Sequence, residues 1–76
     1  MKVIIHTNNE LTKSRLSQEA KRLYPEDERL FTKTLDELKK VLDEHCPGVV
    51  RIFFAGAQLD VFEAREHIER ARGVQV

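Results

Sequence analysis

The residues of this 76-residue sequence that could carry out acid–base or thiol chemistry are three histidines and one cysteine. His6 follows a short apolar run, so we expect it at the end of a strand, where open α/β sheets bind their ligands. His45 and Cys46 are adjacent, but successive residues of a helix point about 100° apart. We therefore expect Cys46 to be a buried structural thiol and His67 to be solvated. Because no spacing fixes a partner for any of these side chains, the sequence predicts no enzyme and no catalytic residue.

Neither a metal site nor a bound cofactor is expected. A single cysteine cannot form an internal disulfide, and no Cys-x-x-Cys pair or Cys/His set with zinc spacing is present. Residues 45–51 are similar to the His-Cys-x5-Arg loop of cysteine phosphatases with one residue missing. That loop joins a strand to the N-terminus of a helix, whose backbone N–H groups hold phosphate. Here a helix should lead into a strand, so we reject a phosphatase site.

The charge balance limits the classes of partner. Thirteen basic and thirteen acidic residues cancel, which disfavours nucleic-acid binding through bulk positive charge. Basic residues of the first expected helix could touch phosphate, but acidic residues lie among them: Lys13, Arg15, Lys21 and Arg22 against Glu10 and Glu19. No run of about 18 apolar residues occurs, and the N-terminal apolar run is too short for a signal peptide. We expect a cytoplasmic protein with no membrane partner.

Turn-forming residues divide the chain into segments that alternate between a strand period and a helix period. Strands are predicted over residues 2–7, 29–33, 49–55 and 74–76, and helices over 11–24, 35–46 and 61–72. Thr34 with Glu37, and Asp60 with Glu63, form capping boxes that should begin the second and third helices. The helix residues expected to face the core are Leu11, Leu16, Ala20, Leu23, Tyr24, Leu35, Leu38, Val41, Leu42, Cys46, Val61, Ala64, Ile68 and Ala71. Strands that alternate with helices predict an α/β fold of three layers, with a small parallel sheet between helices.

Four stretches of the chain, taken in order, have the pattern of a known family. They are KVIIHTNNEL at residues 2–11, TKTLDEL at 32–38, PGVVRIF at 47–53, and the segment from DVFEA to GV at 60–74. In this order they resemble the first strand, the second strand and helix, the third strand, and the third helix of a response-regulator receiver domain. The resemblance implies a single receiver-like domain over residues 1–76, with a flavodoxin-like sheet of order 2-1-3(-4).

The chain departs from that family where its phosphorylation site would be. The family has two acidic residues that bind magnesium and a carboxylate that accepts phosphate, and the matching positions here are Thr7, Asn8 and Phe53. A phenyl ring cannot take a phosphoryl group, and magnesium needs oxygen ligands. The resemblance therefore implies a regulatory or protein-interaction domain that works without phosphorylation.

Two surfaces are predicted for contact with a partner. The first is the crevice at the carboxyl ends of the strands, lined by His6, Thr7, Asn8, Phe53, Phe54, Gly56 and Ala57. The second is the edge strand, Val74, Gln75 and Val76, whose backbone groups need a cover. We expect a protein partner and a homodimer formed through that edge. The alternative is a small nucleic-acid-binding protein, because a strand followed by a charged helix is similar to the end of a KH domain, although the Gly-x-x-Gly loop is absent.

Overall fold

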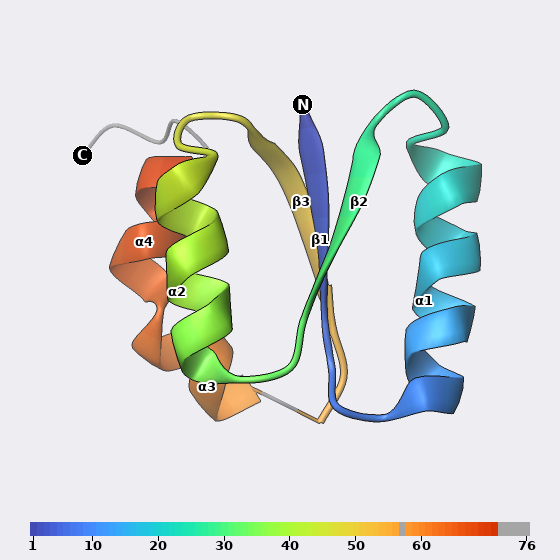
Figure 1. Cartoon of the computed structure of the whole chain (residues 1–76), viewed down its shortest axis with the longest axis horizontal. Coiled ribbons are helices and arrows are strands. Elements are labelled where there is room, and N and C mark those ends of the chain that lie inside the picture. Colours follow the sequence, from blue (N-terminus) through green and yellow to red (C-terminus); the bar gives the residue numbers. More distant parts are fainter. Residues whose placement is uncertain (57, 72–76) are drawn as a thin grey trace.

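The computed structural model describes residues 1–56 and 58–71, and shows a parallel sheet with helices on both faces (Figure 1). The elements are β1 (Lys2–His6), α1 (Glu10–Leu23), β2 (Glu28–Thr32), α2 (Leu35–Glu44), β3 (Val49–Phe54), α3 (Gln58–Glu63) and α4 (Arg65–Ala71). The three strands have the order β2-β1-β3, and both pairings are parallel. The predicted three-layer α/β fold with strand order 2-1-3 is confirmed.

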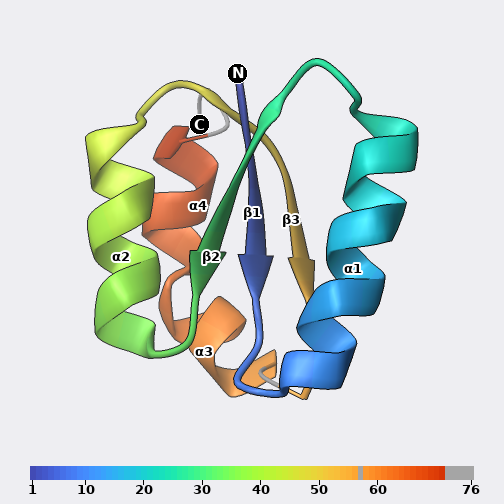
Figure 2. The same cartoon turned by 45° about the vertical axis from the view of Figure 1, so that its right-hand side comes forward.

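The sheet separates two apolar clusters, because alternate residues of β1 point to opposite faces. Ile4 packs with Leu38 and Leu42 on the face that α2 and α4 cover. Val3 and Ile5 pack with Ala20, Phe53 and other residues on the face that α1 covers. Figure 2 shows the same arrangement from a second side, with α1 alone on its face. Since both faces of β1 are covered, its continuous apolar run is the pattern of a central strand.

Local signals set the starts of the first two long helices. The Asn9 side chain accepts a hydrogen bond from the backbone N–H of Thr12 (3.0 Å) at the start of α1. At the start of α2, the Thr34 hydroxyl accepts from the N–H of Glu37 (3.2 Å). The Glu37 carboxylate accepts from the N–H of Lys33 (3.0 Å), one residue before the cap. The capping box predicted there is present, with its return bond displaced by one residue.

The third predicted helix differs from the prediction in its start and continuity. It begins at Gln58 instead of after Asp60, and a turn at Ala64 divides it into α3 and α4. Asp60 therefore lies inside α3, and its carboxylate bonds to His6 instead of capping a helix. Ala64 itself is fully buried, since this turn packs against the core that α2 forms.

Three side chains expected to face the core are exposed. Leu11 and Leu23 are exposed on α1, where Ala20 is buried and Leu16 and Tyr24 pack against the core. In the described part of the chain, no second helix packs beside α1 on this face of the sheet. The part of α1 that is buried is therefore narrower than the apolar face predicted from the sequence. Cys46 is exposed as well, because α2 ends at Glu44 and the thiol lies beyond its buried face. The strand predicted at 74–76 lies outside the described residues.

Gly48 brings the start of β3 close to two other segments. Its N–H donates to the carbonyl of Ala71 at the end of α4 (2.9 Å), and its carbonyl accepts from the N–H of Lys2 (2.6 Å). A Cβ atom at this position would lie 2.8 Å from the backbone carbonyl oxygen of His45. A glycine is therefore required for the approach that joins α2, α4 and β1 at this end of the sheet.

Candidate functional site

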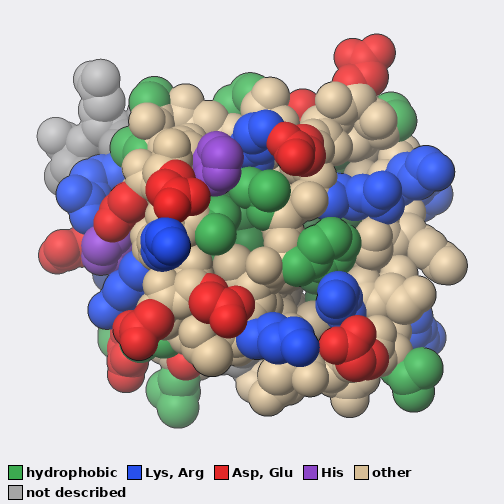
Figure 3. Space-filling view, in the orientation of Figure 1, with side chains coloured by type: hydrophobic (Ala, Val, Ile, Leu, Met, Phe, Trp, Pro, Cys, Tyr) green, Lys and Arg blue, Asp and Glu red, His purple; other side chains and the backbone are tan. Residues whose placement is uncertain are grey.

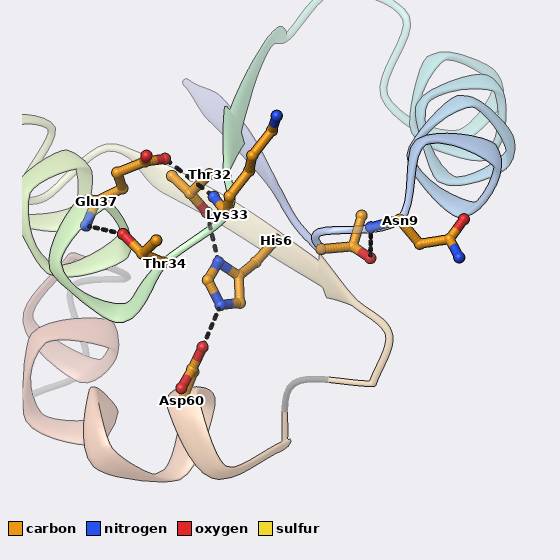
Figure 4. A network of polar contacts seen from close by, with 8 residues as sticks. His6, Asn9, Thr32, Lys33, Thr34, Glu37 and Asp60 are labelled. Carbon is orange, nitrogen blue, oxygen red and sulfur yellow. Dashed lines mark hydrogen bonds and ion pairs between the residues drawn. The ribbon is translucent and has the colours of Figure 1, made fainter.

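His6 is the one histidine that the fold places in the core among the described residues. It is the last residue of β1 and has no exposed surface. Its Nδ1 lies 2.7 Å from the Thr32 hydroxyl, and its Nε2 lies 3.1 Å from the Asp60 carboxylate (Figure 4). A carboxylate only accepts hydrogen bonds, so in the neutral ring Nε2 donates to Asp60 and Nδ1 accepts from the hydroxyl of Thr32.

This arrangement tethers three elements and leaves His6 no free ring nitrogen. Thr32 ends β2 and is almost fully buried, whereas the Asp60 side chain in α3 is 35% exposed. A general base needs a nitrogen within reach of the proton that it takes from a substrate. Since both nitrogens of His6 are occupied and the ring is closed to solvent, the geometry fits a structural tether better than a catalytic base.

The turn after β1 is ordered by its own backbone and side chains. Thr7 is buried, and its N–H donates to the carbonyl of Thr32 (3.1 Å) while its hydroxyl accepts from the N–H of Asn9 (3.3 Å). Asn8 is exposed. Thr7 and Asn8 thus have different environments. The backbone N–H and the hydroxyl oxygen of Thr7 are both bonded within the fold.

Phe53 and Phe54 end β3 and point to opposite faces of the sheet. Phe53 is 8% exposed and packs edge-on against Tyr24, with ring centroids 6.4 Å apart. The Arg51 guanidinium lies over the Phe53 ring, 4.9 Å from its centroid. Phe54 pairs in register with His6 and is 40% exposed. Phe53 therefore belongs to the packing under α1, and Phe54 is available for contact with another molecule.

Further apolar side chains are exposed at the same end of the sheet. Leu59 and Phe62 of α3 are 78% and 71% exposed, and Leu11 of the first turn of α1 is 80% exposed. Figures 1 and 2 both place α3 and the start of α1 at the end where the strands terminate. Gly56, in the loop after β3, has a φ of 69°, which permits the chain to turn toward α3. Ala57 lies outside the described residues.

An open groove of about 410 Å³ runs beside β3. Its walls are Tyr24 on the α1 side and Val61 and Ile68 on the side of α3 and α4. Its floor includes four residues of β3: Val50, Arg51, Ile52 and Phe54. Within residues 1–56 and 58–71, no strand pairs with this edge of β3. The groove therefore lies along an unpaired strand edge, between Tyr24 on one face of the sheet and Val61 and Ile68 on the other.

His45, Cys46 and His67 lie nearer the surface than His6, and Cys46 and His67 make separate contacts. His67 Nδ1 lies 2.8 Å from the Asp43 carboxylate and 3.2 Å from the Arg70 guanidinium, so this ring is less solvated than predicted. The Cys46 thiol donates to the backbone carbonyl of Arg70 (3.1 Å). These contacts hold α2 against α4. In the described part of the chain, no group of three or more His, Cys, Asp or Glu side chains could hold a metal ion.

Several charged side chains on the surface form ion pairs, among them Lys2 with Glu28 and Arg22 with Glu19. Figure 3 shows acidic and basic groups mixed over the face in view. The pKa of Glu28 is lowered by a hydrogen bond from the Lys2 ammonium, and that of Glu19 by one from Arg22, with a further contribution from the charge of Arg51. Lys13 lies 3.7 Å from Glu10 and over the Phe31 ring. The basic residues of α1 therefore form no continuous positive face.

The fold thus places His6 opposite Phe54 at one end of the sheet, with Thr7 directly after His6, whereas Phe53 packs under α1. Thr32 and Asp60 are the residues of this cluster that sequence reasoning missed. Thr32 and His6 lie near the ends of the predicted strands 29–33 and 2–7, which the expected strand order makes neighbours, so their proximity could have been inferred. No such signal existed for Asp60, whose approach depends on how α3 packs.

Comparison with known proteins identified no relative of this chain: no family model matches it, and no match was found among curated proteins or solved structures. No helix in residues 1–56 and 58–71 is both long and apolar enough to cross a membrane.

Proposed function

We propose that this chain is a non-catalytic protein-interaction or regulatory domain that works without phosphorylation. The observation that carries the proposal is the contrast at the carboxyl end of the sheet. There, Phe54, Leu59 and Phe62 are exposed, while the only buried histidine among the described residues has both ring nitrogens bonded. Exposed apolar side chains grouped at one end of a small domain are typical of contact surfaces.

The receiver resemblance supports the same proposal from a different side. Phosphate transfer in that family needs a carboxylate at the end of the third strand, and Phe53 stands at the matching position, packed against Tyr24. Asp60, whose carboxylate reaches the end of β1, bonds to His6. Incubation with acetyl phosphate and magnesium should leave the mass of the protein unchanged. A gain of one phosphoryl group would contradict the proposal.

The contact surface is tested by comparing three baits. The full chain, a Leu59→Ser/Phe62→Ser variant and a Leu23→Ser variant would be coupled to beads, and proteins captured from the native cell identified by mass spectrometry. Leu23 is a matched control because it is also an exposed leucine, at 42%. It is the last residue of α1 and lies at the end of the sheet opposite to Leu59 and Phe62. We expect specific partners to be lost from the double variant and kept by the control. Equal capture by all three baits would contradict the proposed surface.

A further inference from the structure

A second groove, which we call the β2 groove, lies between α1 and β2. It consists of two hollows of about 260 and 220 Å³, and Phe31, which is 44% exposed, lines both of them. The α1 residues that line the hollows recur at helical spacing from Glu10 to Lys21, so they form one face of the helix. Figure 2 shows β2 at the front of the sheet with α1 beside it. The two hollows are therefore parts of one groove along the strand.

The acidic side chains of the β2 groove are matched by cations of the same chain. The Glu10 carboxylate lies 3.7 Å from the ammonium of Lys13. Asp27 lies 3.6 Å from the N-terminal ammonium group, and Glu28 forms an ion pair with Lys2. These carboxylates are therefore already neutralised within the fold.

Two basic side chains of the β2 groove, Lys21 and Arg29, have no carboxylate partner among the described residues. Arg29 is half-buried, and its guanidinium donates to the hydroxyl of Ser17 on α1 (2.9 Å). This bond orients the guanidinium but leaves its charge unmatched. The groove thus presents positive charge beside an exposed aromatic ring, which is complementary to a ligand that carries carboxylates.

The backbone of β2 has hydrogen-bonding groups beside this groove. The Thr32 carbonyl accepts from the N–H of Thr7, so the backbone groups of Thr32 point toward β1. Successive residues of a strand direct these groups alternately to its two sides, so those of Arg29 and Phe31 point to the outer edge. Within residues 1–56 and 58–71, no strand pairs with that edge.

The residues outside the described ranges join the chain at the other side of the sheet. Residue 57 follows the loop after β3, and residues 72–76 follow Ala71, whose carbonyl accepts from the N–H of Gly48 just before β3. Strand β1 lies between β3 and β2. Both attachment points are thus separated from the β2 edge by the central strand.

We propose that the β2 groove binds an extended acidic peptide of a partner protein, which adds as a strand beside β2. The inference goes beyond the proposed function, because it concerns a second surface, away from Leu59 and Phe62. Main-chain hydrogen bonds to Arg29 and Phe31 supply affinity, and alternate side chains of the peptide enter the groove and supply specificity. Carboxylates at these positions pair with Lys21 and Arg29.

A single-stranded nucleic acid fits the β2 groove less well. The Lys13 ammonium lies over the Phe31 ring, 5.0 Å from its centroid, where a stacked base would lie. Glu10, Asp27 and Glu28 line the same groove and repel a ligand with a phosphate at every nucleotide. A peptide can place its carboxylates at alternate positions only, and its backbone groups match those of β2.

The proposal is tested with three probes: a short peptide in which glutamate alternates with valine, the same peptide with lysine in place of glutamate, and oligothymidylate. Each is titrated into the isotope-labelled chain and followed by two-dimensional NMR. We expect the glutamate peptide to shift the amides of Arg29 and Phe31 more than those of β3, and the lysine peptide to bind at least about tenfold more weakly. Preferred binding of the lysine peptide or of oligothymidylate, shifts confined to β3, or no binding of the glutamate peptide overturns the proposal.

The role of the unmatched charge is tested by Lys21→Glu. The affinity for the glutamate peptide should fall at least about threefold, because an attraction at the surface becomes a repulsion. Lys40→Glu is the matched control, since Lys40 is an exposed lysine of α2, on the other face of the sheet, and the net charge changes equally. Equal losses in the two variants overturn the assignment of Lys21 to the site.

Strand addition is tested by N-methylation of the glutamate peptide. A peptide strand directs alternate amides to β2, so methylating one alternate set of amides should abolish binding and methylating the other set should preserve it. Equal effects of the two sets overturn strand addition. None of these measurements involves the capture experiment on Leu59 and Phe62, so failure of the peptide site and failure of the proposed function are distinguishable.

Discussion

The imidazole of His6 and the carboxylate of Asp60, on β1 and α3, meet at 3.1 Å across the carboxyl end of the sheet. The other ring nitrogen of His6 bonds to Thr32 at the end of β2. One side chain thereby ties two strand ends to the helix that follows the third strand. This tether holds α3 in the position from which Leu59 and Phe62 reach solvent.

Removing His6 should lower the free energy of unfolding more than removing Asp60. His6→Ala leaves a cavity and an unpaired buried hydroxyl at Thr32, so we expect a loss of about 2–4 kcal/mol in the free energy of unfolding. Asp60→Ala should cost less, about 1–2 kcal/mol, because it leaves the buried Nε2–H of His6 without its acceptor but removes a side chain that is partly solvated. Urea denaturation measures both, with His67→Ala as the control for a histidine nearer the surface. Equal losses for His6 and Asp60 would contradict the tether as described.

The start of α2 depends on the Thr34 hydroxyl, which accepts from the N–H of Glu37. Thr34→Ala removes this acceptor and should lower the free energy of unfolding by about 1 kcal/mol. Thr34→Ser retains the hydroxyl and should stay close to the wild type. Thermal or urea denaturation followed by circular dichroism measures the difference. If alanine and serine are equivalent at this position, the cap contributes nothing measurable.

The close approach at Gly48 predicts intolerance of any side chain there. A Cβ atom would lie 2.8 Å from the carbonyl oxygen of His45, which is backbone and cannot move aside cheaply. We expect Gly48→Ala to cost about 1–3 kcal/mol, as overpacking usually does. Gly56→Asn is the comparison, because it opens into free space and asparagine tolerates a positive φ. A larger loss at Gly56 than at Gly48 would show that the crowding at Gly48 is relieved.

The Lys2–Glu28 pair should stabilise the fold at neutral pH and lose this contribution in acid. The hydrogen bond from Lys2, and then its charge, lower the pKa of Glu28 from its ordinary 4.5. A lowered carboxyl pKa stabilises the fold above the unfolded-state value, and the contribution is lost as the pH falls through the folded-state value. The stability difference between wild type and Glu28→Gln should therefore narrow on acidification below pH 4.5.

Urea denaturation at a series of pH values measures this difference. Glu26→Gln, which removes an exposed carboxyl group of the same turn, controls for the change in net charge. Both groups of the pair are at the surface, so the effect should be small and should weaken in added salt. A stability difference that widens as the pH falls would contradict the assignment.

Much of the architecture follows from patterns that are local in sequence. The apolar run of β1, the cap at Thr34 and the turn at Gly48 each act within a few residues, so the first strand and the second helix were predictable from them. The strand order 2-1-3 came from the receiver resemblance. The prediction of a buried position is confirmed for Leu38 and Leu42, and it is wrong for Leu11, which is exposed. Helical spacing shows which residues share a face, but how wide a stripe is covered depends on how many elements pack there.

The sequence by itself determined that strands and helices alternate, that the first strand is central, and that clustered acidic residues are missing where Thr7 and Asn8 stand. Tertiary structure decided that His6 is tethered by Thr32 and Asp60, that Phe54 faces solvent while Phe53 is packed, and that β3 keeps an open edge among the described residues. The physical reason is that propensity and capping act between near neighbours. Burial and side-chain pairing depend on which segments, distant in sequence, pack together. His6 and Asp60 meet only when α3 packs at the carboxyl end of the sheet.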